Sequence, residues 1–89
     1  MILTGPLDAA AADAVRTLLA AATEADGVMP ASEDARIGLG DSGRTHVRAV
    51  LNDGSFAGYA QVGQDGTAEL VVHPDQRRKG VGRTLLDRV

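Results

Sequence analysis

The residues best suited to chemistry lie near the end of the chain, where "RRKGVG" covers Arg77 to Gly82 between a predicted strand and a predicted helix. The first turn of a helix has backbone N–H groups without internal partners, and the helix dipole adds partial positive charge there. Glycines let an anion approach the backbone closely. Four basic side chains surround this point: Arg77, Arg78, Lys79 and Arg83. The pattern therefore predicts a phosphate or pyrophosphate site.

Two better-known phosphate motifs do not fit these residues. The P-loop pattern GxxxxGK[ST] places lysine after the glycines, whereas Lys79 precedes them. The dinucleotide pattern GxGxxG requires a third glycine where Leu85 stands. A solvated basic helix start with glycines for packing is the alternative, and it would be favoured for "GxG" alone. The longer pattern, strand-Pro-x-x-Arg-x-x-Gly-x-Gly-helix, favours the anion site.

Charge is distributed unevenly along the chain. The formal net charge is -3, with -7 in residues 1–76 and +4 in residues 77–89. The acidic total and the lack of stacking aromatics near the basic stretch argue against a nucleic-acid binder. Positive potential is concentrated in the last residues, so an anionic ligand is expected there.

Composition limits the remaining function classes. The 89 residues, 44% of them hydrophobic, are enough for one small globular domain, 1–89. The absence of cysteine excludes disulfides, thiolate metal sites and a cysteine nucleophile, and it fits a reducing cytoplasm. His46 and His73 show no metal-binding spacing. No apolar run approaches membrane-spanning length, and Met1–Ala12 lacks the basic start of a signal peptide.

Helical spacing and then alternation predict the elements that must position the site. A long helix is expected from an N-cap at Asp8 to Gly27, and a short one from Ser32 to Ile37. Three strands follow, at 45–51, 56–62 and 67–72, joined by short turns into an antiparallel meander. Pro74 ends the third strand, and a second long helix is expected over 75–89, with Val81, Leu85 and Val89 on one side. The predicted class is α+β.

The segment "VVHPDQRRKGVG" resembles motif A of the GNAT acyl-CoA N-acyltransferases, [Q/R]-x-x-G-x-[G/A], and "AGYAQV" is similar to the third strand of that family. The family order is a strand, two helices, a meander and the motif helix. The resemblance implies acetyl-CoA as cosubstrate, with its pyrophosphate on the backbone amides of the motif loop and its pantetheine arm paired with the preceding strand. The residues implied are Leu70, Val71, Val72, Arg77, Arg78, Lys79, Gly80, Val81, Gly82 and Arg83.

A narrower resemblance comes from "VRTLLAAATEADGVMPASE" together with "AELVVHPDQRRKGVG". Both are similar to the N-terminal acetyltransferase domain of the actinobacterial mycothiol synthases, in which two such domains are fused. This implies transfer of acetyl to the cysteinyl amine of a glucosamine–inositol conjugate, with Glu33 contacting the polar substrate. From the residues alone, Glu33 is an acidic side chain in the first turn of a helix, where the dipole favours it.

No catalytic residue is assigned. The strand glutamate that serves many family members as general base lies eight positions before the motif proline, and here that position is Gly66. Glu69 lies five positions before Pro74, on the opposite strand face, so it is predicted to be structural or solvated. Tyr59, the only phenol, is predicted to pack within its strand with its hydroxyl near water.

The resemblance also predicts a fifth strand, a further helix and closing strands after Val89, so the chain is expected to be the N-terminal part of one GNAT domain. Two hypotheses follow: part of an acetyltransferase, acting on this or another amine, or a non-catalytic acetyl-CoA-binding module. The chain alone is expected to bind coenzyme A weakly and to turn over nothing. Its open sheet edge is expected to pair with a missing domain or with a second copy.

Overall fold

In the computed structural model, which describes residues 1–89, the first long helix is α1 (Ala9–Asp26). The Asp8 carboxylate caps it by accepting a hydrogen bond of 2.8 Å from the Ala11 N–H. Gly27 ends it in a left-handed conformation, φ 76°, with its N–H bonded to the Thr23 carbonyl. The N-cap at Asp8 and the end at Gly27 are those predicted, and the helix buries one stripe of its surface. The stripe comprises Ala12, Val15, Leu18, Leu19 and Ala22.

The second helix, α2 (Glu33–Ile37), begins at the predicted N-cap, where the Ser32 hydroxyl accepts from the Ala35 N–H at 3.1 Å. It ends at a short 3₁₀ turn, η1 (Gly38–Gly40). Two glycines within three residues leave little to favour a longer helix. The α1–α2 loop, α2 and η1 together connect α1 to β2.

The sheet is antiparallel throughout and has the order β1-β2-β3-β4. Its strands are β1 (Ile2–Thr4), β2 (Thr45–Val50), β3 (Phe56–Val62) and β4 (Ala68–Val72). The three meander strands and the α+β class are confirmed. The residue pattern did not predict β1, because three residues are too few to show alternation.

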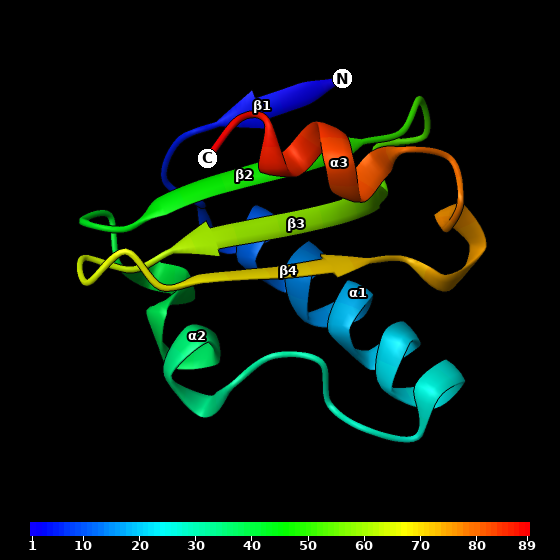
Figure 1. Cartoon of the computed structure of the whole chain (residues 1–89), viewed down its shortest axis with the longest axis horizontal. Coiled ribbons are helices and arrows are strands. Elements are labelled where there is room, and N and C mark those ends of the chain that lie inside the picture. The colour runs from blue at the N-terminus through cyan, green and yellow to red at the C-terminus, as the bar shows by residue number, and fades with distance from the viewer.

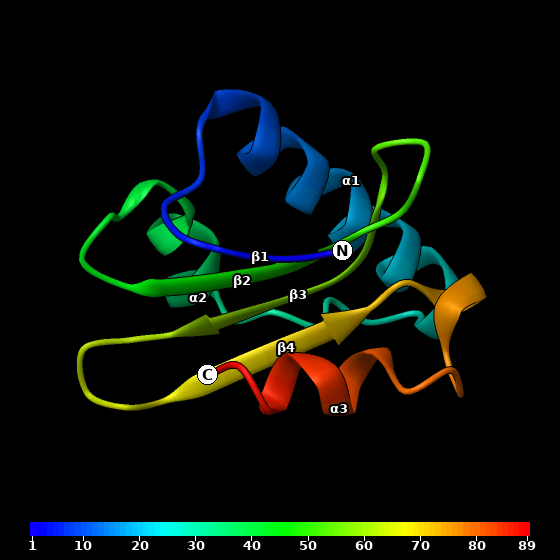
Figure 2. The same ribbon diagram turned by 90° about the horizontal axis from the view of Figure 1, so that it is seen from above.

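Helices cover both faces of the sheet, with α1 and α2 on one side and α3 (Val81–Leu86) on the other (Figure 1, Figure 2). The α1 face carries one core cluster: Ala12, Val15, Leu18, Leu19, Ala22, Leu39, Phe56, Tyr59 and Val71. The α3 face carries another: Val47, Ala49, Ala57, Ala60 and Leu85. No helix has both the length and the apolar character needed to cross a bilayer.

The predicted long helix over 75–89 is wrong. Pro74–Gln76 form a 3₁₀ turn, η2, residues 77–80 form a loop, and α3 begins only at Val81. The reason is left-handed backbone, with φ of 63° at Arg78 and 80° at Gly80, which a right-handed helix cannot include. Leu85 is fully buried as expected, but Val89 is 47% exposed rather than packed with it.

Gly58 allows α3 to lie directly on β3. A Cβ atom at this position would come within 2.9 Å of side-chain atoms of both Val81 and Leu85, and within 3.1 Å of the Val71 carbonyl oxygen. Any larger residue would push the helix away from the strand. The glycine in "AGYAQV" thus fixes the distance between the motif helix and the sheet.

We expect Leu85→Ala to lower the free energy of unfolding by about 2–5 kcal/mol, because it opens a cavity in the smaller core. Leu86→Ala is the matched control, since Leu86 is 54% exposed and its loss should change stability by about 0.5 kcal/mol or less. Urea unfolding followed by circular dichroism measures both. Equal effects of the two variants would contradict the position of α3.

Candidate functional site

The loop between β4 and α3 has unpaired backbone donors. None of the seven consecutive N–H groups of residues 77–83 donates a hydrogen bond to another group of the chain. Backbone hydrogen bonding resumes at Thr84, whose N–H and hydroxyl both donate to the Gly80 carbonyl. Turns that combine left- and right-handed residues form concave sets of N–H groups that bind anions. This run of free donors coincides with the predicted phosphate loop; it begins before the helix and continues into the first turn of α3 at residues 81–83.

The basic side chains of this loop fall into two kinds. Those of Arg78, Lys79 and Arg83 are exposed and belong to none of the ion pairs of the structure. The Arg77 guanidinium instead forms a bidentate pair with Asp26, with N–O distances of 2.8 and 2.6 Å. Three charges are free for a ligand, while the charge of Arg77 serves the fold.

The Arg77–Asp26 pair ties the loop to the C-terminal end of α1, 51 residues earlier. The hydrogen bond from Arg77, supported by its charge, holds the pKa of Asp26 below its usual value. The same bond raises the pKa of Arg77. Both side chains are therefore charged at neutral pH, and the start of the loop is held in place.

The two motif glycines have different roles. Gly80 needs to be glycine because its φ is 80°. A Cβ at Gly82 would lie 3.5 Å from side-chain atoms of Leu70 and Val72, which is ordinary van der Waals contact. This agrees with a motif that allows alanine at the second position but not at the first. It also places the loop directly beside β4.

The outer edge of β4 presents two of the three predicted strand residues. Bonds from Gly63 N–H to the Thr67 carbonyl and from His73 N–H to the Ala57 carbonyl fix the phase of the β3–β4 ladder. By the alternation of antiparallel pairs, the backbone groups of Val71 face β3, and those of Leu70 and Val72 face the open edge. The edge and the phosphate loop are thus contiguous.

A buried network of hydrogen-bonded polar side chains lies on the sheet face that α1 and α2 cover. The His46 Nε2 is 2.7 Å from the Asp41 carbonyl, so Nε2 carries hydrogen and Nδ1 accepts from the Tyr59 hydroxyl at 2.6 Å. Gln61 donates to this hydroxyl and to the Ala35 carbonyl, both at 2.9 Å. Arg44 donates to the Gln61 Oε1 at 2.9 Å. Every member has a partner, which indicates a structural role.

This hydrogen-bonded network shows that the prediction for Tyr59 was wrong. Its hydroxyl was expected near water, but the residue is 5% exposed and its partners are His46 and Gln61. Burial raises the pKa of the phenol. His46 is equally enclosed, at 1% exposure. His73 is half-buried, and its Nδ1 accepts from the Asp75 N–H.

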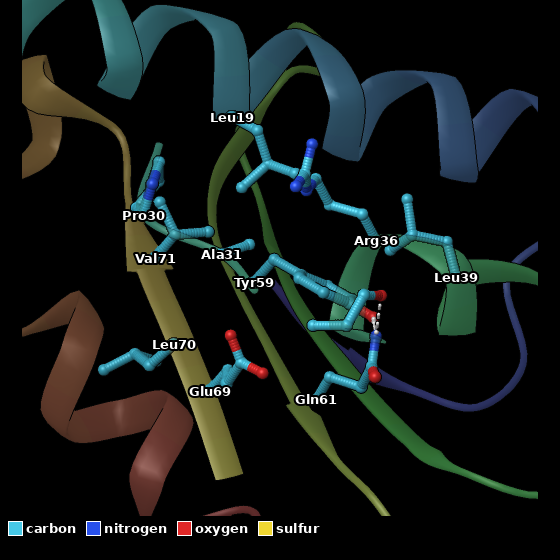
Figure 3. Close-up of a pocket in the computed structure, with 11 residues that line it drawn as sticks. Leu19, Pro30, Ala31, Arg36, Leu39, Tyr59, Gln61, Glu69, Leu70 and Val71 are labelled. Atoms are coloured by element: carbon cyan, nitrogen blue, oxygen red, sulfur yellow. Dashed lines mark hydrogen bonds between the residues drawn. The ribbon is translucent and has the colours of Figure 1, made fainter. Parts of the chain in front are cut away.

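The two candidate carboxylates lie close together. Glu69 on β4 accepts hydrogen bonds from the N–H and the hydroxyl of Ser32, so both of its oxygens are engaged. Its side chain projects to the same side as those of Tyr59 and Gln61 (Figure 3). Glu33, the next residue after Ser32, is exposed and makes no hydrogen bond or ion pair. Glu69 is thus structurally engaged, and Glu33 is free to meet a ligand.

Sequence reasoning missed Asp26 and Ser32 as partners of the site. Asp26 reads only as the end of a helix and Ser32 only as a cap, and each lies far from its partner along the chain. Only the cap of Ser32 had a sequence signal. Asp26 and Ser32 thus hold Arg77 and Glu69 in place, although neither was a candidate site residue.

Comparison with known proteins adds three findings. The family model described as acetyltransferase (GNAT) domain matches residues 42–89. The mycothiol acetyltransferases of Geodermatophilus obscurus and Nocardia farcinica are 50% and 43% identical to the chain over 93% of it. A GCN5-related N-acetyltransferase from Sphaerobacter thermophilus superimposes with a TM-score of 0.73 at 32% identity, over 98% of the chain. The chain spans about 30% of the length of each of these proteins.

We expect the Arg77–Asp26 pair to stabilise the fold at neutral pH and not in acid. The folded pKa of Asp26 lies below the unfolded value of 3.8, so its contribution is present above pH 3.8 and lost as pH falls through the folded pKa. The stability difference between the natural chain and Asp26→Asn should shrink over that range. Urea unfolding at pH 7 and below pH 4 measures it. A difference independent of pH would contradict the ionic pairing. Glu24→Gln is the control, because Glu24 is exposed on α1 and belongs to none of the ion pairs.

Proposed function

Because the chain belongs to the GNAT acetyltransferase family, we propose that it binds acetyl-CoA and serves the transfer of acetyl to an amine. The observation that carries this proposal is the run of free N–H groups at 77–83, which adjoins three unpaired basic side chains and the open edge of β4. A diphosphate is matched by such a loop, and an amide-bearing arm is matched by an unpaired strand edge.

The proposed roles follow from which groups are free. The amides of residues 77–83 bind the pyrophosphate, and Arg78, Lys79 and Arg83 neutralise its charge. The outward N–H and C=O groups of Leu70 and Val72 pair with the pantetheine amides, and Val71 contributes packing under the edge. Bound acetyl-CoA would supply a thioester. The amine nitrogen forms an amide bond to the acetyl carbon, the C–S bond breaks, and coenzyme A leaves as the thiol, its sulfur taking up a proton as the amine loses one. A backbone N–H at this edge stabilises the oxyanion.

For the acceptor, we propose the cysteinyl amine of desacetylmycothiol, with Glu33 as a contact for its polar groups. Support comes from relatives named mycothiol acetyltransferases and from the position of Glu33, which is exposed and directly follows Ser32, the partner of Glu69 on β4. The chain represents about 30% of those relatives, so a further domain or a second copy is the proposed partner.

A second candidate is a non-catalytic acetyl-CoA-binding module. It is favoured by the engagement of both Glu69 oxygens with Ser32 and by the burial of the Tyr59 hydroxyl. The Tyr59 hydroxyl is thus enclosed, and the Glu69 carboxylate is held by Ser32 rather than standing free beside a substrate. A thiol-release assay with acetyl-CoA and desacetylmycothiol separates the two candidates. We expect no turnover from the 89 residues alone, and turnover would favour the enzyme.

We expect acetyl-CoA to give a binding isotherm in calorimetric titration and acetyl-pantetheine, which lacks the pyrophosphate, to bind at least about tenfold more weakly. Combined replacement of Lys79 and Arg83 by alanine should cost about tenfold and should flatten the dependence on salt, because two charges facing the phosphates are lost. Arg16→Ala is the control, since Arg16 pairs with Asp13 on α1.

Two outcomes would refute the phosphate loop. One is a folded chain that gives no heat with acetyl-CoA. The other is equal affinity for acetyl-CoA and acetyl-pantetheine, which would place the binding energy elsewhere.

A further inference from the structure

Glu69 and Ser32 form the contact between β4 and the α1–α2 loop that lies over it. The Ser32 N–H donates to one oxygen of Glu69 at 2.8 Å, and the Ser32 hydroxyl donates to the other. Hydrogen bonds to an ionised carboxylate are about twice as strong as neutral ones. The Arg36 side chain adds a weaker bond of 3.4 Å to the Ser32 carbonyl. We call the Ser32–Glu69 pair the loop clamp.

The loop clamp closes a crevice between the loop and the sheet. Pro30 and Ala31 lie over it, and Tyr59 and Val71 form part of its floor (Figure 3). The crevice is partly open, and the space within it that the centre of a water-sized sphere can reach is ≈ 10 Å³, room for about one water molecule. The loop is therefore held against the sheet, and the crevice is too small for a ligand as it stands.

The loop clamp also fixes Glu33. Consecutive Cα atoms lie about 3.8 Å apart, so Glu33 cannot move far from Ser32 while Ser32 is held. In Figure 1, α2 and the α1–α2 loop lie below β4, on the side of its open edge. Glu33, which is exposed, therefore stays close to Ser32 and to the strand that carries Glu69.

We propose that Glu69 is a positioning residue for the amine acceptor: through Ser32 it holds the α1–α2 loop and Glu33 beside the edge of β4. This rests on the proposed function, which places the acetyl thioester along that edge. In this role Glu69 acts through Ser32, which donates a hydrogen bond to each of its oxygens, and not on the amine itself. An acceptor with an ammonium or hydroxyl groups meets Glu33 in a fixed place, which lowers the ordering cost of binding.

The structure offers variants that separate the loop clamp from the helix cap. Glu69→Ala removes the loop clamp but leaves the Ser32 hydroxyl to accept from the Ala35 N–H. Ser32→Asp keeps a capping oxygen and places a second carboxylate against Glu69. Ser32→Thr keeps both functions. Glu24→Ala, at an exposed position of α1, is the control for loss of an acidic side chain.

The first measurement is hydrogen exchange of residues 28–36. Glu69→Ala and Ser32→Asp should raise the exchange rate of the Ser32 amide about tenfold or more, and Ser32→Thr and Glu24→Ala should leave it unchanged. Unchanged exchange in Glu69→Ala would overturn the loop clamp.

The second measurement is an NMR titration of the chain, loaded with acetyl-CoA, with desacetylmycothiol. Glu69→Ala and Ser32→Asp should weaken acceptor binding about tenfold and leave acetyl-CoA binding unchanged, and Ser32→Thr should restore the natural affinity. Acceptor affinity that is unchanged in Glu69→Ala, or absent in the natural chain, overturns the positioning role. Failure of the natural chain to bind acetyl-CoA refutes the proposed function instead, and the exchange measurement still tests the loop clamp.

Discussion

The site depends on how the backbone turns between β4 and α3. Left-handed residues at Arg78 and Gly80 take the chain out of the strand without helical hydrogen bonds, so the amides of 77–83 stay free. A continuous helix from Asp75 would have paired several of these amides with preceding carbonyls. The conformation that prevents a long helix is therefore the one that leaves these amides free for the proposed phosphate.

Two contacts hold this turn against the sheet. Gly58 lets α3 approach β3 to van der Waals distance, and Leu85 of α3 packs into the smaller core cluster. On the opposite side the Arg77–Asp26 pair fixes the beginning of the loop to α1. Packing on one face and an ion pair at the end of a helix on the other together hold the loop beside the outward backbone groups of Leu70 and Val72.

Local signals predicted most of the fold. Asp8, Gly27 and Ser32 marked helix ends correctly because capping depends on neighbouring residues. Alternation located β2, β3 and β4. The start of α3 was misplaced because positive φ at a non-glycine residue, Arg78, has no sequence signal. The strand β1 was missed because it has only three residues and gains its hydrogen bonds from β2, far along the chain.

The candidate site was predicted in part. "RRKGVG" identified the loop, and its resemblance to motif A agreed with the family that the comparisons found. The sequence could not show that Arg77 is ion-paired while the other basic residues of the loop are free, because the partner of Arg77 lies 51 residues away. The engagement of Glu69 by Ser32 likewise requires the folded chain. Spacing along a sequence gives the residue types of a site, but the partners of each charge come from tertiary structure.

In the function proposed here, residues 77–83 and the edge of β4 form one surface for acetyl-CoA. Amide chemical shifts of the 89-residue chain, recorded with increasing acetyl-CoA, test it most directly. The largest shifts should lie at residues 77–83, followed by Leu70 and Val72, with little change in the buried network around His46. Shifts confined to other regions, or no shifts at saturating ligand with a folded chain, would contradict the account.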